Sequence, residues 1–435
     1  MRMTSFVAAA TLAAAFGFTT APAAGVGRPG ITPVACGTQA WKAVDPAFQA
    51  LSGAKAYFGS YDGGVYHIEI PDKWNGELML SSHGYVAAAG DRGLELRVGQ
   101  PAFRQHLIDE GFAWAASSYR CNGYVPGQGL LDTMALTDLF TKFNAGTAPR
   151  RVYLTGTSMG GHVTVLGMHE FPTSFAGGMA MCASGPELFD YDTAVSAAAE
   201  VVSGLQFQQG NTRDVAAKMN GMFGAPPHYT DKGRAMANIE IDLSGGPRPF
   251  AVEGLASGGR FAANVSSGAG SMSGGTNPSS AVTTNSNYKY AIDAAMGLTG
   301  DRMNAMVRRK QPDMKYRDAT GPFDELVPFD GQIQRPLLTM HGTGDLFVPI
   351  NLEQTLNRAV TAAGKQDLLV QRIYRIAGHC GFNAAEQAKS FDDLVAWVRE
   401  GRKPEGDTIM GDLSNAGRTF TSPLRAGDPG TLRVK

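Results

Sequence analysis

Charged residues are scarce in this chain, and neither sign dominates. Only 18% of the 435 residues are charged, against about 25% in an average soluble protein, and 38 basic residues face 39 acidic ones. A dedicated nucleic-acid-binding protein concentrates positive charge, so this balance argues against that class. The 55 glycines and 23 prolines fall short of the share that marks low-complexity disorder. With 43% hydrophobic residues, the chain is expected to fold around a large core or two smaller ones.

Long hydrophobic runs are absent beyond the first residues. Residues 1–24 have the arrangement of a secretory signal peptide: Arg2, an alanine-rich apolar stretch from Phe6 to Phe18, and the small-residue pattern Ala21-Pro22-Ala23. The apolar stretch is shorter than the roughly 20 residues that cross a bilayer. We therefore expect a secreted protein, periplasmic or extracellular, with no integral membrane segment.

Cysteine is also rare, with four residues, Cys36, Cys121, Cys182 and Cys380. An even number in an oxidising compartment favours one or two disulfides. Four cysteines allow three pairings, and the sequence does not choose among them; free buried thiols remain an alternative. Their spacing fits no zinc motif, so no metal is expected.

Strand-like runs alternate with helical ones over much of the chain. The expected strands are residues 64–70, 77–82, 112–119, 151–155, 177–183, 336–340 and 368–376, and the expected helices are residues 101–109, 130–143, 160–169, 352–363 and 384–399. Such alternation is typical of an α/β fold with a mostly parallel central sheet flanked by helices.

The alternation lapses over residues 185–327, which predicts a large inserted cap. Helical runs at 194–205 and 290–309 surround a Gly/Ser/Asn-rich segment, residues 257–286, expected to be a long mobile surface loop. The expected organisation is a signal peptide at 1–24, a core of residues 25–184 and 328–405, the cap at 185–327 and a tail at 406–435.

One short motif carries the strongest chemical signal. Gly156-Thr157-Ser158-Met159-Gly160-Gly161 lies between an expected strand and an expected helix. Glycines on both sides of a serine allow the tight, strained turn that lifts a nucleophilic hydroxyl out of a sheet. Ser158 is therefore the candidate nucleophile.

A serine nucleophile needs a histidine base, and that base needs a carboxylate to orient it. His379 and Asp345 each follow an expected strand, and the carboxyl ends of parallel strands build sites at one edge of a sheet. Asp330 and Asp324 are alternatives to Asp345. The remaining candidate histidines are expected to pack in the core, support the site from behind or face solvent: His341, His162 and His169.

Acyl transfer also needs donors for the oxyanion. One is expected from the backbone N–H of Met159, directly after the nucleophile. The other is expected from the loop His83-Gly84-Tyr85, which follows an expected strand, through the N–H of Tyr85. An ordinary turn at His83-Gly84 is the alternative.

At these residues the sequence resembles the α/β-hydrolase superfamily, and within it secreted bacterial esterases near poly(3-hydroxybutyrate) depolymerases, feruloyl esterases and prolyl-oligopeptidase-like hydrolases. The resemblance rests on His83 to Tyr85, Gly156 to Gly161, His341 to Pro349 and Gly378 to Phe382. It implies that Ser158, Asp345 and His379 are nucleophile, acid and base, and that no cofactor takes part. It does not extend to residues 185–327.

The function expected from these observations is hydrolysis of carboxylic esters through an acyl-enzyme. The partner is then a small-molecule or polymeric ester, with no nucleic acid, metal or protein partner implied. A serine peptidase is an alternative, in which Glu187, Asp190 or Asp192 would bind a substrate's amino terminus. A non-catalytic binding protein on a hydrolase scaffold is the other alternative.

Overall fold

The structure is a computed structural model that describes residues 36–274, 278–292, 298–313, 326, 328–425, 428 and 430–435. The predicted signal peptide and the alternative acid Asp324 lie outside these residues. Within them, no helix combines the length and the apolar composition that a membrane crossing requires.

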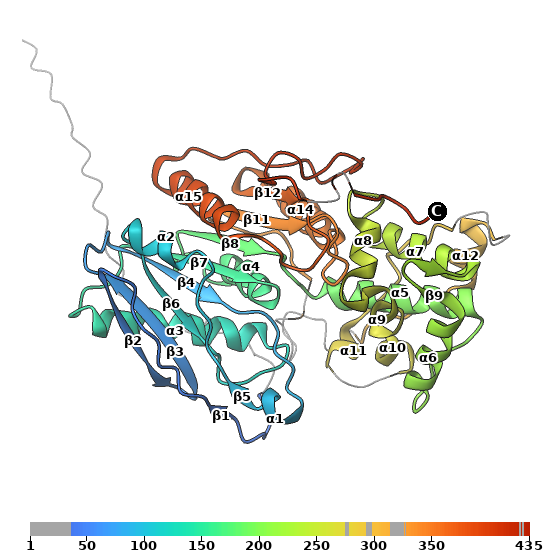
Figure 1. Ribbon diagram of the computed structural model, residues 1–435, viewed down its shortest axis with the longest axis horizontal. Helices are drawn as coiled ribbons and strands as arrows, with labels where there is room; N and C mark the ends of the chain where they lie inside the picture. The colour runs from blue at the N-terminus through green and yellow to red at the C-terminus, as the bar shows by residue number, and fades with distance from the viewer. Residues whose placement is uncertain are drawn as a thin grey trace, which may run out of the picture.

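The centre of the molecule is an eight-stranded sheet (Figure 1). Its strands are β2 (Ala54–Tyr61), β3 (Gly64–Pro71), β4 (Glu77–Ser82), β6 (Ala113–Ser117), β7 (Arg151–Thr157), β8 (Gly177–Met181), β11 (Leu337–Gly342) and β12 (Leu369–Tyr374). The strand order is β2-β3-β6-β4-β7-β8-β11-β12. Only β3 pairs antiparallel with its neighbours, and every other pairing is parallel.

Both faces of the sheet are covered, as the alternation of side chains along each strand requires. In β4, Met79 points to one face and Leu80 to the other, and both are fully buried. The face with Met79 is covered by α2 (Arg104–Asp109) and α15 (Ala384–Glu400), and the face with Leu80 by α3 (Pro126–Phe143), α4 (Met159–Glu170) and α14 (Asn351–Ala362). The predicted α/β class with a mostly parallel sheet is thus confirmed.

The last helix of the core shows how local sequence sets its ends. At the start of α15, Asn383 accepts a hydrogen bond from the Glu386 N–H, while the Glu386 carboxylate accepts one from the Asn383 N–H. This capping box satisfies donors that have no partner within the helix. At the other end Gly401 has φ 72°, a left-handed conformation that glycine adopts without a steric penalty.

A group of helices is inserted between β8 and β11 and gathers beside one end of the sheet (Figure 1). We call this group the helical insertion; it comprises α5 (Glu187–Ser203), α6 (Thr212–Phe223), α7 (Asp231–Leu243), α8 (Ala251–Ala256), α9 (Arg260–Ser267), α10 (Ala269–Met272), α11 (Pro278–Val282) and α12 (Gly300–Met306). Its hydrophobic side chains, among them Tyr191, Phe223 and Phe261, form one buried cluster together with Leu346, Val348 and Leu352 of the α/β core.

The prediction of a mobile loop over residues 257–286 is wrong for the described part of that segment. It contains α9, α10 and α11, with Phe261 and Val265 buried. Its small residues allow close packing: a Cβ added at Gly268 would lie 2.3 Å from the Asp192 carbonyl oxygen. The glycines and serines therefore reflect tight contact between helices rather than a solvated chain. The helix expected over 290–309 is limited to α12 among the described residues.

The C-terminal residues run along the edge of the core and end on the helical insertion. On the core side, the Arg375 side chain donates a hydrogen bond to the Ala416 carbonyl (3.0 Å) and pairs with Asp428. On the insertion side, the Thr431 N–H donates to Glu253, and the Val434 N–H donates to Asn238 Oδ1 (3.0 Å). The tail therefore fastens the insertion to the core.

Removal of residues 430–435 should loosen this attachment. The truncated protein loses the contacts to Glu253 and Asn238, and we expect the free energy of unfolding to fall by about 2–4 kcal/mol, since each hydrogen bond contributes about 0.5–1.5 kcal/mol. Calorimetry would measure the change. Deletion of Lys435 alone is the matched control, and equal unfolding curves for both proteins would contradict the fastening role.

Candidate active site

Ser158 lies on a strained turn between β7 and α4. Its φ and ψ are 59° and −120°, an unusual conformation for a residue with a side chain. The turn requires glycine on both sides. A Cβ at Gly156 would lie 2.1 Å from the Gly160 carbonyl oxygen, and one at Gly160 would lie 2.1 Å from the Ser82 carbonyl oxygen. The strand–turn–helix context predicted for this motif is therefore present.

The structure brings Ser158, His379 and Asp345 together in one line. His379 Nε2 lies 2.9 Å from Ser158 Oγ, and His379 Nδ1 lies 2.6 Å from Asp345 Oδ2. Ser158 and His379 are partly buried, whereas Asp345 is only 1% exposed. The hydroxyl can pass its proton to the imidazole, and the carboxylate can hold the imidazole and stabilise its positive form.

Asp345 is held as a carboxylate inside the protein. Burial alone would raise the pKa of Asp345, but the contact with His379 and the nearby His341 lower the pKa below its ordinary value. Its second oxygen, Oδ1, accepts hydrogen bonds from the N–H groups of Phe347 and Val348, each at 3.0 Å. Both carboxylate oxygens are therefore satisfied, so the side chain has one orientation.

Behind Asp345, His341 and Glu353 extend the line into the core. His341 is fully buried, and its Nε2 donates to the Val348 carbonyl at 2.9 Å. Its Nδ1 lies 3.6 Å from Glu353 Oε1, so this pair is an ion contact rather than a hydrogen bond. Burial would lower the pKa of His341, but Glu353 and Asp345 outweigh it and raise the pKa above the ordinary value. His341 supports the site from behind, as predicted, and does not contact Ser158.

The other candidates are engaged elsewhere. Asp330 is 62% exposed in its side chain and pairs with His169 Nε2 at 2.9 Å. His162 is buried with its Nδ1 2.9 Å from the Tyr124 hydroxyl, and burial lowers the pKa of His162 to about 4. It is therefore neutral at physiological pH.

The loop predicted to supply an oxyanion donor lies directly against the nucleophile. A Cβ added at Gly84 would lie 3.2 Å from Ser158 Cβ, a tight contact, so the loop backbone passes close to the serine. His83 holds the loop, because its ring stacks on Tyr119 at 3.9 Å and contacts the Ser118 carbonyl at 3.0 Å. Among the described residues, the N–H groups of Tyr85 and Met159 have no hydrogen-bond acceptor. Both remain available to a bound oxygen.

The four cysteines form two disulfides, Cys36–Cys121 and Cys182–Cys380. This outcome excludes the alternative of free thiols. The second bridge ties the residue that follows His379 to the end of β8, across 198 positions of sequence. Cys182, Cys380 and His379 also place their ligand atoms within 4.8 Å of one another, but both sulfurs are bonded and offer no thiolate to a metal.

Two charged residues that support the site were not predicted. Arg248, from the helical insertion, is fully buried and donates from Nε to the Thr343 carbonyl at 2.6 Å, in the loop that carries Asp345. Glu353 Oε2 accepts hydrogen bonds from Thr339 Oγ1 and Gln371 Nε2, each at 2.6 Å. Neither residue belongs to a local motif, since each reaches the site only through the tertiary fold.

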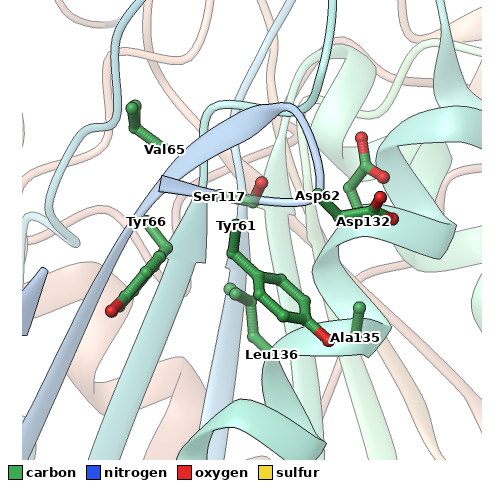
Figure 2. Close-up of a pocket in the computed structure, with 8 residues that line it drawn as sticks. All are labelled: Tyr61, Asp62, Val65, Tyr66, Ser117, Asp132, Ala135 and Leu136. Atoms are coloured by element: carbon green, nitrogen blue, oxygen red, sulfur yellow. The ribbon is translucent and has the colours of Figure 1, made fainter. Parts of the chain in front are cut away.

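A small hollow elsewhere in the core is unrelated to these residues (Figure 2). It lies between the β2–β3 hairpin and α3, and its lining includes Tyr61, Tyr66 and Asp132. Asp132 already pairs with Arg120 at 2.6 Å. None of Ser158, His379 and Asp345 lines it.

The sheet order, with β3 alone reversed and Ser158 on the turn after β7, decides the fold. The chain has the α/β-hydrolase fold. Among solved structures, it is similar to feruloyl esterase B from Aspergillus oryzae, with 14% sequence identity, 81% of this chain and 82% of that chain covered, and a TM-score of 0.44.

Two further α/β-hydrolase structures are similar at comparable identity. The acylaminoacyl peptidase from Pyrococcus horikoshii is 12% identical, with 82% of this chain aligned and a TM-score of 0.40, and this chain spans only 43% of its length. The rice cell wall degrading esterase LipA from Xanthomonas oryzae is 13% identical, with 77% and 85% covered and a TM-score of 0.34. No protein-family model and no curated protein matches the chain.

The disulfide beside His379 should matter more for reactivity at Ser158 than the other disulfide. We expect the double variant Cys182→Ser/Cys380→Ser to react with a fluorophosphonate at least tenfold more slowly, because small displacements of reacting groups are costly. Cys36→Ser/Cys121→Ser is the matched control, expected to lose thermal stability only. Equal labelling rates of the two double variants at a temperature where both are folded would contradict this role.

The buried pair of His341 and Glu353 should make stability depend on pH. Because the folded pKa of His341 is raised, its contribution is fully present below the ordinary histidine pKa of about 6.5 and is lost as pH rises through the folded value. Glu353→Gln should therefore lower the free energy of unfolding more at pH 5.5 than at pH 9, by about 1.4 kcal/mol for each pKa unit removed. Urea unfolding at both pH values measures this, and an equal loss at both would show that His341 is neutral.

Proposed function

We propose that the protein is a serine hydrolase that cleaves carboxylic esters through an acyl-enzyme. The observation that carries this proposal is the hydrogen-bonded line from Ser158 Oγ through both ring nitrogens of His379 to Asp345. A binding protein on the same scaffold has no need of a strained serine aligned with a buried, ionised acid. We assign Ser158 as nucleophile, His379 as general base and Asp345 as the orienting acid.

The proposed reaction has two halves. Ser158 Oγ attacks the ester carbonyl carbon while its proton passes to His379 Nε2. The tetrahedral intermediate collapses, the bond to the alcohol oxygen breaks, and His379 returns the proton to that oxygen. A water molecule then gives its proton to His379 and attacks the carbonyl carbon of the acyl-enzyme. The bond from this carbon to Ser158 Oγ breaks, His379 returns the proton to Ser158 Oγ, and the carboxylic acid leaves.

The N–H groups of Tyr85 and Met159 are proposed to bind the negatively charged oxygen of each tetrahedral intermediate. Their availability and the approach of Gly84 to Ser158 support this assignment. Donors of this kind are preorganised, so they need no rearrangement as the charge develops. Loss of one such donor in comparable enzymes costs about 2.7–4 kcal/mol of transition-state stabilisation.

We favour ester over peptide cleavage because two of the three acidic residues that could bind a substrate's amino terminus, Asp190 and Asp192, have partners within the helical insertion. Asp190 is buried, and its Oδ1 accepts a hydrogen bond from the Thr284 N–H at 2.7 Å. Asp192 interacts with Ser267 within the helical insertion. These contacts engage both carboxyl groups in the packing of the insertion.

We further propose the organisation and location of the protein. The helical insertion is the cap, at residues 185–327, and the core comprises residues 25–184 and 328–405. Two disulfides are consistent with an oxidising compartment, which supports export by a signal peptide at residues 1–24.

The test is a fluorophosphonate label followed by a substrate panel. Wild-type protein should form one covalent adduct, located by mass spectrometry on Ser158, and should hydrolyse nitrophenyl esters faster than aminoacyl anilides. Ser158→Ala should form no adduct and lose ester turnover on the order of 10⁶-fold, with a melting temperature near that of the wild type.

Three outcomes would contradict the proposal in different ways. A folded wild type that forms no adduct favours the binding protein. Faster cleavage of the anilides favours the peptidase. Collapse of Ser158→Ala on heating, well below the wild type, would make the serine structural.

A further inference from the structure

One exposed aromatic side chain stands beside the imidazole of the site. Phe347 is 37% exposed although it lies two residues from the buried Asp345. Its ring meets the His379 ring edge-on, with 5.0 Å between centroids. The imidazole that returns a proton to the leaving alcohol must lie beside that alcohol. Phe347 therefore borders the place that the alcohol part of an ester would occupy.

A cation from the helical insertion covers this ring. The Arg260 guanidinium carbon lies 4.1 Å from the centroid of Phe347, a cation–π distance. The only hydrogen bond of its side chain to a described residue is a long one, from Nη1 to Asn264 Oδ1 at 3.4 Å. It forms no ion pair with any residue that the structure describes. Most of its five N–H donors are therefore unused.

The position of Arg260 is set by close contact between the insertion and the loops of the site. A Cβ at Gly254 would lie 2.0 Å from the Gly344 carbonyl oxygen, and one at Gly378 would meet Ser257 Oγ at 3.4 Å. Gly344 precedes Asp345, and Gly378 precedes His379. Gly254 and Ser257 thus pack against the two loops that carry the proposed acid and base. Arg260, the first residue of α9, follows them in the chain.

Two acidic groups, Glu240 and Asp192, lie near Arg260, but neither forms an ion pair with its guanidinium. Glu240 is fully buried, and burial raises the pKa of Glu240 to about 8. Burial also raises the pKa of Asp192 to about 7. The Glu240 carboxyl is instead occupied by Asn264 Nδ2, 2.5 Å from its Oε1. Because most N–H donors of the Arg260 guanidinium have no acceptor among the described residues, the group is suited to bind an anion through two parallel hydrogen bonds.

We propose that Arg260, stacked on Phe347, binds a carboxylate carried by the alcohol part of the substrate. The inference rests on the proposed ester hydrolysis and names its substrate class: esters whose leaving alcohol bears a free carboxylate, separated from the ester by an apolar or aromatic spacer that lies on Phe347. Arg260 then selects the substrate and takes no part in the proton transfers.

The test compares two esters that differ only in this charge. 4-(Acetoxymethyl)benzoate has a free carboxylate on its alcohol part, and 4-(acetoxymethyl)benzamide is the neutral counterpart with the same acetyl group and no second ester bond. Wild-type protein should cleave the carboxylate form with a kcat/KM at least tenfold higher, expressed mainly in a lower KM. This preference should shrink as salt is added, because salt screens exposed charges.

Arg260→Gln should reduce the ratio of the two kcat/KM values by about tenfold or more, as loss of a hydrogen-bonded charge contact does. Arg260→Lys keeps the charge without the planar fork and should retain part of the preference. Arg213→Gln, at an exposed position on α6, is the control for loss of one positive charge and should keep the wild-type ratio.

The possible failures are distinguishable. If the wild type cleaves both esters with equal kcat/KM, or if Arg260→Gln keeps the wild-type ratio, the role of Arg260 is overturned while ester hydrolysis stands. If the wild type cleaves neither ester and forms no fluorophosphonate adduct, the proposed function fails, and the substrate class fails with it. Fluorophosphonate labelling of Arg260→Gln confirms that the variant is folded before the ratios are compared.

Discussion

The hydrogen bond between His379 Nε2 and Ser158 Oγ joins residues 221 positions apart, and it depends on several features that hold these two side chains in place. Ser158 is fixed by the strained turn that Gly156 and Gly160 permit. The loop of His379 is fixed by the disulfide that follows it and by the contact of its Nδ1 with Asp345. A sheet with parallel strands places both ends of this bond at the same edge, because the strands before them end there.

Acidic and imidazole side chains alternate from Glu353 in the core, through His341 and Asp345, to His379. Glu353 is a buried carboxylate in the first turn of α14, where the helix dipole favours negative charge. Its Oε1 lies 3.6 Å from His341 Nδ1. His341 Nε2 donates a hydrogen bond to the Val348 carbonyl, and the Val348 N–H donates one to Asp345 Oδ1. The carboxylates of Glu353 and Asp345 on either side raise the pKa of His341, and His379 and His341 lower the pKa of Asp345. The imidazole at the surface then meets an ionised partner in a fixed orientation.

Prediction from the sequence succeeded where a short segment determines its own geometry. The turn around Ser158 needs glycines at fixed offsets, and that turn is present. Asp345 and His379 each follow a buried strand, and the structure places both in the hydrogen-bonded line with Ser158 on which their proposed roles rest. Arg248 and Glu353 show no such pattern, since their positions depend on how distant helices pack. The average composition of residues 257–286 was misleading, because packing depends on the few buried side chains, such as Phe261, and not on the mean. Disulfide pairing likewise required distances that only the fold supplies.

The interface between the helical insertion and the core bears on how such proteins diversify. Arg248 donates to the carbonyl of Thr343, and Gly254 packs against the carbonyl of Gly344. The insertion therefore supports the loop that carries Asp345 from outside the core. It is therefore no interchangeable module. A chimaera that receives a foreign insertion would lose these two contacts, and the loop that carries Asp345, the proposed acid, would lack this support. The proposed selectivity and the proposed chemistry of this chain therefore depend on the same interface.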